Sequence, residues 1–115
     1  MSDACLFCRI VRREMNAELV YEDDRVIAFR DIHPQAPVHL LIVPRLHIAT
    51  VNDVRETHTP EIAALFHAAA KIAVDQGVDK SGYRLVVNCQ EGAGQSVFHL
   101  HLHLLGGRRM QWPPG

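Results

Sequence analysis

Three histidines stand at every second position near the C-terminal end of the sequence. His99, His101 and His103 alternate with leucines. Because successive side chains of a strand point to opposite faces, this pattern predicts a strand over 97–105 with the three imidazoles on one face. An imidazole that is neutral near pH 7 can act as a nucleophile, as a general acid or base, or as a metal ligand.

These three chemistries compete with a solvent-facing strand that has no chemical role. Lys, Thr or Glu would serve a wetted face equally well, so three histidines in register favour a functional site. Same-face Cα atoms of a strand lie about 6.6 Å apart, which leaves the outer pair about 13 Å apart. Two neighbouring imidazoles can chelate an ion, but all three converge on one ion only under strain. Nucleophilic catalysis is the remaining interpretation.

A glycine-containing loop comes just before the histidines. Its sequence, Gly92-Ala93-Gly94-Gln95-Ser96, offers backbone N–H groups, an amide and a hydroxyl. Such loops suit phosphate oxygens, although they are more often ordinary turns. Next to the three histidines, the loop points to phosphoryl or nucleotidyl transfer.

The composition limits the class of protein. The chain has 115 residues, of which 48% are hydrophobic and 22% charged, and its formal net charge is -1. We expect one globular domain over 1–115 that binds neither nucleic acid nor a membrane surface. Three cysteines, an odd number, favour free thiols or metal ligands in the cytoplasm over a disulfide framework.

The elements that must position the histidines follow from hydrophobic periodicity and turn residues. The expected class is α+β, with a mainly antiparallel five-stranded sheet, one short helix and one long helix. A short amphipathic helix is predicted over 5–13. The long helix is predicted to begin with Thr59 as N-cap and to end at Gly77. Its predicted buried stripe consists of Ile62, Leu65, Phe66, Ala69, Ile72 and Ala73. Strands are predicted over 19–21, 25–29, 39–43, 83–88 and 97–105.

The sequence resembles the histidine triad superfamily. His99-Leu100-His101-Leu102-His103-Leu104-Leu105 matches the signature in which histidines alternate with apolar residues. Similarity extends over nearly the whole chain, and the endings Gly106-Gly107-Arg108 and Trp112-Pro113-Pro114-Gly115 look like the histidine triad nucleotide-binding branch. The resemblance implies a HIT-like fold and a homodimeric hydrolase of purine nucleoside phosphoramidates, typically adenosine 5′-monophosphoramidates.

The resemblance also implies roles for single residues. His101 would be the nucleophile, His99 would orient it through its carbonyl, and His103 with Ser96 would assist the leaving amine. His39 would lie behind the triad. Nucleotide contacts are implied for Asp31, Asn88, Gly94, Gln95, Ser96, Val97 and the apolar Leu6, Phe7, Ile10, Phe29 and Ile32. Core packing would select the same apolar types, so this alternative stays open for those five.

A Cys-x-x-Cys pair lies near the N-terminus. Cys5 and Cys8 have the spacing of half a zinc site. Relatives in the superfamily join such a pair to two histidines, and the matching positions are His47 and His99. A structural Zn²⁺ is therefore one expectation, with no cofactor for catalysis itself. A reduced pair packed against the core is the other.

The resemblance further implies that two subunits pair through the long helix and the strand after it, which continues the sheet across the dimer. A C-terminal arm, residues 108–115, would carry Trp112 toward the partner's active site. Rival functions are dinucleoside polyphosphate hydrolysis, nucleotidyl transfer to an acceptor other than water, and a nucleotide-binding regulatory role.

Overall fold

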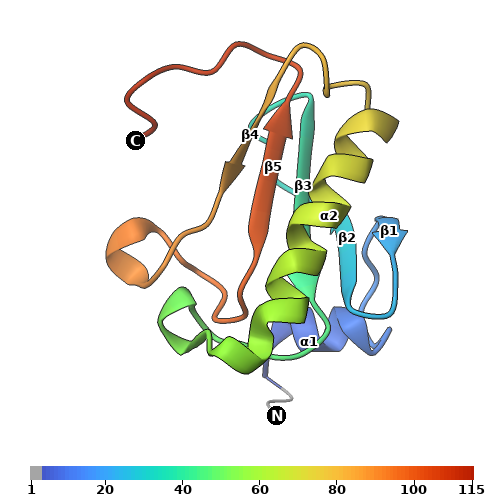
Figure 1. Ribbon diagram of the computed structural model, residues 1–115, viewed down its shortest axis with the longest axis vertical. Coiled ribbons are helices and arrows are strands. Elements are labelled where there is room, and N and C mark those ends of the chain that lie inside the picture. The colour runs from blue at the N-terminus through green and yellow to red at the C-terminus, as the bar shows by residue number, and fades with distance from the viewer. Residues whose placement is uncertain (1–3) are drawn as a thin grey trace.

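A five-stranded antiparallel sheet forms the centre of the computed structural model, which describes residues 4–115 (Figure 1). Residues 1–3 of the expected domain lie outside the described part. The strands follow the spatial order β1-β2-β3-β5-β4, and every neighbouring pair is antiparallel. Their bounds are β1 Leu19–Glu22, β2 Val26–Arg30, β3 Val38–Pro44, β4 Tyr83–Val86 and β5 Leu102–Gly106. The predicted class and the predicted sheet are confirmed.

The turn between β1 and β2 is built on Asp23. Its carboxylate accepts hydrogen bonds from the backbone N–H groups of Arg25 and Val26, at 2.8 and 2.9 Å, and from the Tyr21 hydroxyl at 2.7 Å. A carboxylate that satisfies the backbone donors of a turn fixes the turn's geometry. The acidic residues between the two strands predicted over 19–21 and 25–29 therefore close this hairpin.

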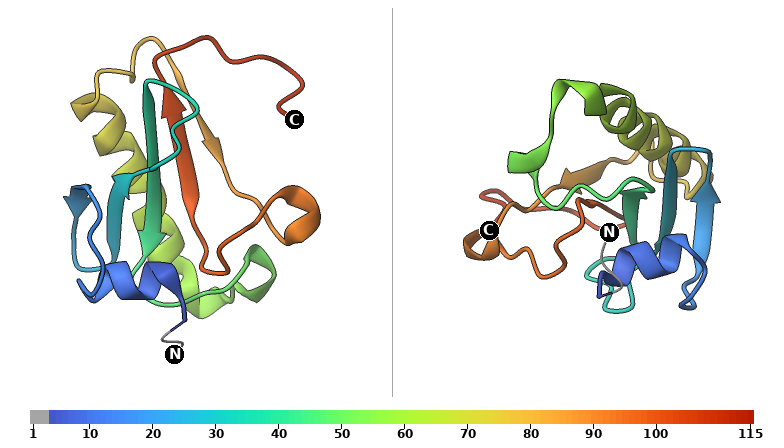
Figure 2. Two further views of the ribbon diagram at one scale, coloured as in Figure 1. Left: turned by 180° about the vertical axis from the view of Figure 1, so that it is seen from behind. Right: turned by 90° about the horizontal axis from the view of Figure 1, so that it is seen from below.

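The two helices cover opposite faces of the sheet. Helix α1, Leu6–Val11, lies across one face, and helix α2, Thr59–Asp75, lies across the other (Figure 2). Within the described residues 4–115, three short 3₁₀ turns lie at Val51–Asp53, Glu56–His58 and Glu91–Ala93. No helix within residues 4–115 is long and apolar enough to cross a membrane.

Both ends of α2 follow from local chemistry, and one end differs from the prediction. The chain enters α2 through the Glu56–His58 turn, so His58 takes the N-cap position. Thr59 is already helical, and its hydroxyl donates to the Glu56 carbonyl at 2.7 Å. At the other end Gly77 has a φ of +74°, and the Val78 N–H reaches the Ala73 carbonyl at 2.9 Å. This is the predicted glycine stop.

Helix α2 packs against the main core, but not with Phe66. Leu65, Ala69 and Ile72 are buried together with β-strand residues, as predicted, and Ala68 is buried beside them. The Phe66 side chain is 51% exposed, so its predicted place in the buried stripe is wrong. The buried residues Leu65, Ala68, Ala69 and Ile72 recur at steps of three and four residues, and Phe66 lies at the edge of the stripe that they form.

The last strand is shorter than predicted. Strand β5 begins at Leu102, where it pairs with Ile42 of β3, and residues 97–101 are irregular. This segment instead follows the 45–50 loop, and the Leu100 N–H donates to the Ile48 carbonyl at 2.6 Å. Strand β4 likewise stops at Val86 instead of at Asn88.

Candidate active site

A pocket of about 410 Å³ lies between α1, the end of β2 and the segment that leads into β5. Of the residues expected around a nucleotide, twelve line this pocket: Leu6, Phe7, Ile10, Phe29, Asp31, Ile32, Asn88, Gly94, Ser96, Val97, His101 and His103. Apolar side chains occupy the α1 side, and the loop and histidine residues occupy the other. The pocket thus has one end for an apolar ring and one end for an anion.

His101 is oriented by the carbonyl of His99. The His101 Nδ1 lies 2.8 Å from this oxygen, which can only accept, so Nδ1 carries the hydrogen and the neutral ring has a free lone pair on Nε2. The ring is buried, and burial lowers its pKa below the ordinary value. Phe7 packs edge-on against it, with ring centroids 5.1 Å apart. An unprotonated imidazole in this pocket is a competent nucleophile.

The irregular path of residues 97–101 makes this contact available. In a regular central strand, the His99 carbonyl would be committed to a ladder hydrogen bond. Since β5 begins only at Leu102, the carbonyl is free to accept from the imidazole two residues later. The alternation still holds for packing, because Leu100, Leu102 and Leu104 all enter the main core.

A chain of hydrogen bonds fixes the protons of His39 and His103. The Gln35 backbone N–H donates to His39 Nδ1 at 2.9 Å, so neutral His39 carries its hydrogen on Nε2. This Nε2 lies 3.0 Å from His103 Nδ1, which therefore accepts. Neutral His103 then presents an N–H donor at Nε2. Burial and the neighbouring His101 and His39 lower the pKa of His103 to about 4.

Asp31 lies beside this chain at the end of β2. One carboxylate oxygen accepts from the His33 backbone N–H at 2.8 Å, and the other lies 3.4 Å from His39 Nε2. The negative charge raises the pKa of His39, but burial outweighs it and the net shift is downward. Asp31 also lines the pocket, where its oxygens can accept hydrogen bonds from hydroxyl groups.

The glycine loop reaches the pocket through Gly94, Ser96 and Val97 but not through Gln95. The Gln95 side chain is 4% exposed; its oxygen accepts from the Gln90 N–H at 2.8 Å, and its amide nitrogen donates to the Ala49 carbonyl at 2.9 Å. The Gln95 side chain therefore braces the loop internally and does not line the pocket, while its expected nucleotide contact stays a prediction. Gly94 has a φ of +92°, a conformation that glycine adopts without strain.

Four side chains expected to bind zinc lie together behind the pocket. The ligand atoms of Cys5, Cys8, His47 and His99 all fall within 4.8 Å of one another. His99 Nδ1 lies 3.4 Å from the Cys5 sulfur, 3.5 Å from the Cys8 sulfur and 3.2 Å from His47 Nδ1. Cys8 Sγ lies 3.2 Å from His47 Nδ1.

These separations suit a tetrahedral ion. Zinc bonds of about 2.3 Å to sulfur and about 2.0 Å to nitrogen place S and N about 3.6 Å apart and two N atoms about 3.3 Å apart. His99 Nε2 donates to the Pro44 carbonyl at 2.8 Å, which leaves Nδ1 unprotonated toward the thiols. Burial and the adjacent Cys5 raise the pKa of Cys8 to about 11, so a bound cation would have to displace its proton. The cluster could hold a metal.

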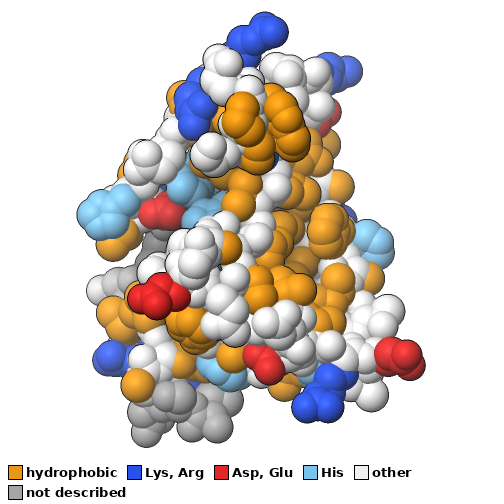
Figure 3. All heavy atoms as spheres, turned by 90° about the vertical axis from the view of Figure 1, so that its left-hand side faces the viewer, with side chains coloured by type: hydrophobic (Ala, Val, Ile, Leu, Met, Phe, Trp, Pro, Cys, Tyr) orange, Lys and Arg blue, Asp and Glu red, His pale blue; other side chains and the backbone are white. Residues whose placement is uncertain are grey.

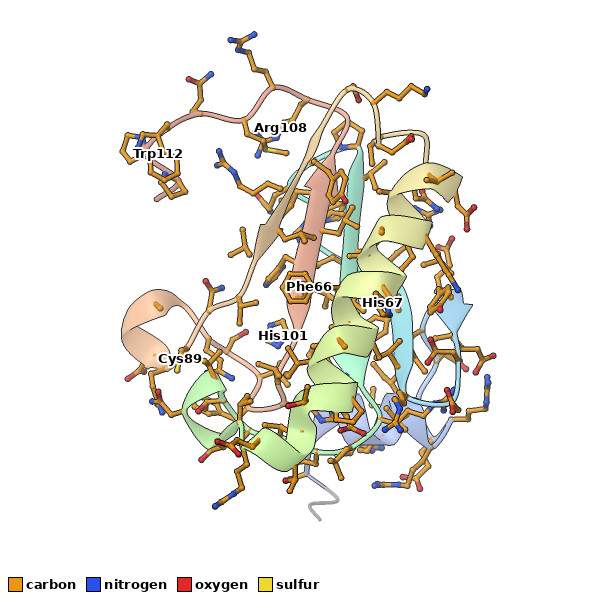
Figure 4. The ribbon with its side chains drawn as sticks, viewed as in Figure 1. Phe66, His67, Cys89, His101, Arg108 and Trp112 are labelled. Carbon is orange, nitrogen blue, oxygen red and sulfur yellow. The ribbon has the colours of Figure 1, made fainter. Side chains whose placement is uncertain are left out.

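Trp112 does not reach this pocket within one chain. Its side chain is 81% exposed, and it lies far along the C-terminal arm from His101 (Figure 4). Arg84 and Arg108 hold the arm at its base, through the carbonyls of Gln111 and Gln35 at 2.9 Å each. Any contact between Trp112 and an active site must therefore involve another chain or a different course of the arm.

Six residues of the pocket were not expected from the sequence. They are Met15, Asn16, Ala17, Arg30, His33 and Leu41. Arg30 and His33 flank the expected Asp31 and Ile32, so adjacency in sequence was an available signal for them. The three residues from 15 to 17 come from the α1–β1 connection, and only the packing of this connection against α1 brings them to the pocket.

The model of the HIT domain family matches residues 12–110. The chain belongs to the HIT family. A purine nucleoside phosphoramidase of Escherichia coli is 49% identical over 108 residues, which cover 94% of this chain and 91% of that protein. An uncharacterized HIT-like protein of Synechococcus elongatus is 46% identical over the full length of both chains.

Solved structures agree with the family assignment. A HIT family hydrolase from Legionella pneumophila matches with a TM-score of 0.95 and 54% identity, covering 96% of this chain and 99% of that one. A HIT family hydrolase from Clostridium thermocellum matches with a TM-score of 0.94 and 49% identity, covering 96% of each chain. These HIT relatives support hydrolysis as the reaction class of this chain.

Proposed function

We propose that the chain hydrolyses the P–N bond of purine nucleoside 5′-phosphoramidates, of the adenosine 5′-monophosphoramidate type, and releases a nucleoside monophosphate and an amine. The observation that carries this proposal is the free Nε2 of His101 in a pocket with an apolar end and a polar end. The name of the Escherichia coli relative supplies the bond type and the purine.

In the first step, the lone pair of His101 Nε2 attacks phosphorus, and the P–N bond of the substrate breaks. The product is a nucleotidyl-histidine that keeps its Nδ1–H on the His99 carbonyl. The positive charge that develops on the ring is stabilised by this carbonyl, 2.8 Å from Nδ1. The leaving nitrogen takes up one proton and departs as the amine.

His103 and Ser96 serve the phosphate and the leaving group. His103 points its Nε2–H donor away from His39 and can hydrogen-bond a phosphate oxygen or the leaving nitrogen. The Ser96 hydroxyl can relay a proton from solvent to that nitrogen. In the second step, water attacks phosphorus, the P–Nε2 bond breaks and the water gives up a proton to solvent, which replaces the proton taken up by the leaving amine. Neutral His101 is regenerated with the monophosphate as product.

The nucleotide is held by the remaining lining residues. The Asp31 carboxylate accepts from the ribose hydroxyls, and the loop residues Gly94 and Val97 with Asn88 face the phosphate. The base lies between the apolar side chains of Leu6, Phe7, Ile10, Phe29 and Ile32. Phe7 and Phe29 already contact each other edge-to-face, at 5.4 Å between centroids, so this wall is preformed.

The Cys5–Cys8–His47–His99 cluster is proposed as a structural zinc site. Its two thiolates and two imidazoles form a complete set of four ligands, which is typical of structural sites and leaves no position for substrate. Zinc there would fix the ring of His99 and tie α1 to the segment that carries His101. The catalytic steps above use no metal.

A homodimer is proposed for the whole molecule, in the cytoplasm. The outward face of α2 carries the apolar residues Ala63, Phe66, Ala70 and Val74, and β4 pairs on one side only, with β5. Figure 3 shows hydrophobic side chains gathered on this side of the molecule. Paired across a two-fold axis, two such faces would bury each other and continue the sheet, and the arm would carry Trp112 to the partner.

The decisive experiment is His101→Ala. We expect turnover of adenosine 5′-monophosphoramidate to fall by several orders of magnitude, because the electron pair that forms the new bond is lost. Binding of AMP should largely persist, since the walls and the loop remain. Rapid quenching of the wild-type protein should trap a covalent adduct whose mass equals one nucleotidyl group. Activity within tenfold of wild type would contradict the assignment of His101.

A further inference from the structure

Asn16 brings an unused amide to the apolar end of the pocket. Its side chain is exposed and lines the pocket together with Ile10, Met15 and Ala17. Within residues 4–115 its amide has no hydrogen-bond partner in the folded chain. An amide has two N–H donors and an oxygen that accepts two hydrogen bonds, so its full capacity is available to a ligand.

The position of Asn16 assigns it to the base end of the pocket. Phe7 contacts the His101 ring, at 5.1 Å between centroids, and Ile10 follows one helical turn further along α1. Asn16 adjoins Ile10 and also borders a smaller hollow of about 120 Å³ that contains Ile10 but no histidine. A nucleotide with its phosphorus at His101 would therefore direct its base toward Asn16.

We propose that the Asn16 amide hydrogen-bonds the N6/N7 edge of the purine and gives the pocket a preference for adenine over guanine; this inference rests on the proposed function. At this edge adenine presents an N–H donor at N6 beside the acceptor N7, and one amide satisfies both groups at once. Guanine presents two acceptors there, O6 and N7, which an amide can satisfy only in part. Guanine regains both hydrogen bonds only if it turns its O6/N1–H edge toward Asn16, and equal binding of AMP and GMP would reveal that orientation.

Arg30 is the other polar group near this end, and it favours the opposite base. A guanidinium pairs with the two acceptors of guanine. Here, however, the Arg30 Nε donates to the Glu18 carboxylate at 2.7 Å, which occupies part of its fork and holds the side chain. The Asn16 side chain makes no such hydrogen bond within residues 4–115. The Asn16 amide therefore determines which of the two bases binds more tightly.

Calorimetric binding of AMP, GMP and ribose 5-phosphate tests the assignment without catalysis. The wild-type protein should bind AMP at least about fivefold more tightly than GMP, the lower end of what one bidentate pair supplies. Asn16→Ala should bring the two within about twofold through weaker AMP binding, while ribose 5-phosphate affinity stays unchanged. Asn52→Ala is the matched control, because Asn52 is exposed and lies outside the pocket.

Two further variants separate the outcomes. Asn16→Asp removes the donor for the ring nitrogen and should weaken AMP binding at least as much as Asn16→Ala. Arg30→Gln should keep the preference for AMP. Equal binding of AMP and GMP by the wild type, or a preference that survives Asn16→Ala, overturns the role of Asn16 and leaves the proposed function standing. A wild-type protein that binds neither nucleotide overturns both.

Discussion

His99 takes part in two neighbouring sites, the proposed nucleophile and the Cys/His cluster. It contacts the first through its backbone carbonyl and the second through its ring. Its carbonyl accepts the hydrogen of His101 Nδ1, while its ring lies among the cysteine thiols and donates to the Pro44 carbonyl. The ring is fully buried, and burial lowers its pKa to about 4. One residue thus joins the proposed nucleophile to the Cys/His cluster, so the position of the cluster helps to set the orientation of the His101 ring.

His103 makes folding stability depend on acid pH. Its pKa is about 4 in the folded chain and about 6.5 in an unfolded one. Between these values the unfolded chain binds more protons, so the free energy of unfolding falls as pH drops from about 6.5 to about 4 and is unaffected by this group above that range. We expect the melting temperature of wild type to fall more steeply in this window than that of His103→Gln.

The control for this pH effect is His67→Gln. His67 lies exposed on α2 (Figure 4), away from the hydrogen-bonded pair His39 and His103, so its removal should leave the acid dependence of the melting temperature unchanged. Parallel wild-type and His103→Gln curves from pH 7 down to pH 4 would show that His103 has no depressed pKa.

At the scale of the elements, the periodicity of the sequence predicted which side chains are buried better than it predicted where each strand begins and ends. The alternation of histidine and leucine correctly predicted which side chains enter the core, because that depends only on the period of the chain. It did not predict that β5 begins at Leu102, because strand length depends on the partner: β3 ends at Pro44, and beyond it Leu100 bonds to the 45–50 loop. Phe66 was misplaced for a similar reason, since only the packed sheet selects among neighbouring helix residues.

The candidate site could be predicted where the type of a residue itself indicates a chemical role. The histidines and the cysteines stood out by type and spacing, Asp31 was implied by the family resemblance, and the fold brings them to one region. The place of the Gln95 side chain could not be predicted, because a polar residue in a loop can face a ligand or brace the loop, and here its amide donates to the half-buried Ala49 carbonyl. Asn16 gave no sequence signal at all, since it reaches the pocket only through the packing of the α1–β1 connection.

The Cys/His cluster ties α1 to the histidine segment, and its loss should loosen that element. If zinc is bound, wild-type protein purified without chelator should contain about one zinc per chain, and Cys8→Ser should contain none. We expect its melting temperature to fall by at least about 5 °C, because about 1 kcal/mol shifts a domain of this size by roughly that much. Elemental analysis and thermal melting measure both effects.

Cys89→Ser provides the comparison for that experiment. Cys89 is half-buried and takes no part in the cluster, so its replacement should change neither zinc content nor melting temperature by a comparable amount. Absence of zinc from the wild-type protein would refute the zinc proposal and leave a reduced thiol pair as the state of the cluster.

At the scale of the whole molecule, one face is more apolar than a water-exposed surface needs to be. Phe66 and Val74 on α2 are 51% and 59% exposed, and Val51 and Val87 beside them are 44% and 41% exposed. A mainly apolar groove of about 340 Å³ runs between α2, the Val51–Asp53 turn and the end of β4. Its lining also includes Leu100 and His101. A second chain on this face would bury the groove and exclude water from the back of the proposed nucleophile.

Sedimentation of Phe66→Asp tests this assembly. We expect the wild type to sediment as a dimer at micromolar concentration and the variant to dissociate at least about tenfold more readily, because a buried unpaired carboxylate is strongly unfavourable in an interface. Leu46→Asp introduces the same charge at an exposed apolar residue outside this face and should remain dimeric. Wild-type protein that sediments as a monomer would contradict the dimer.

The late start of β5 also bears on attempts to transplant this site. A designer who copied residues 99–105 onto a regular central strand would reproduce every side chain of the motif. However, the carbonyl of residue 99 would then accept a hydrogen bond from a neighbouring strand. The imidazole two positions on would then lose its acceptor, and its tautomer would no longer be fixed. The smallest portable unit therefore includes the 45–50 loop, whose Ile48 carbonyl holds Leu100 out of the sheet.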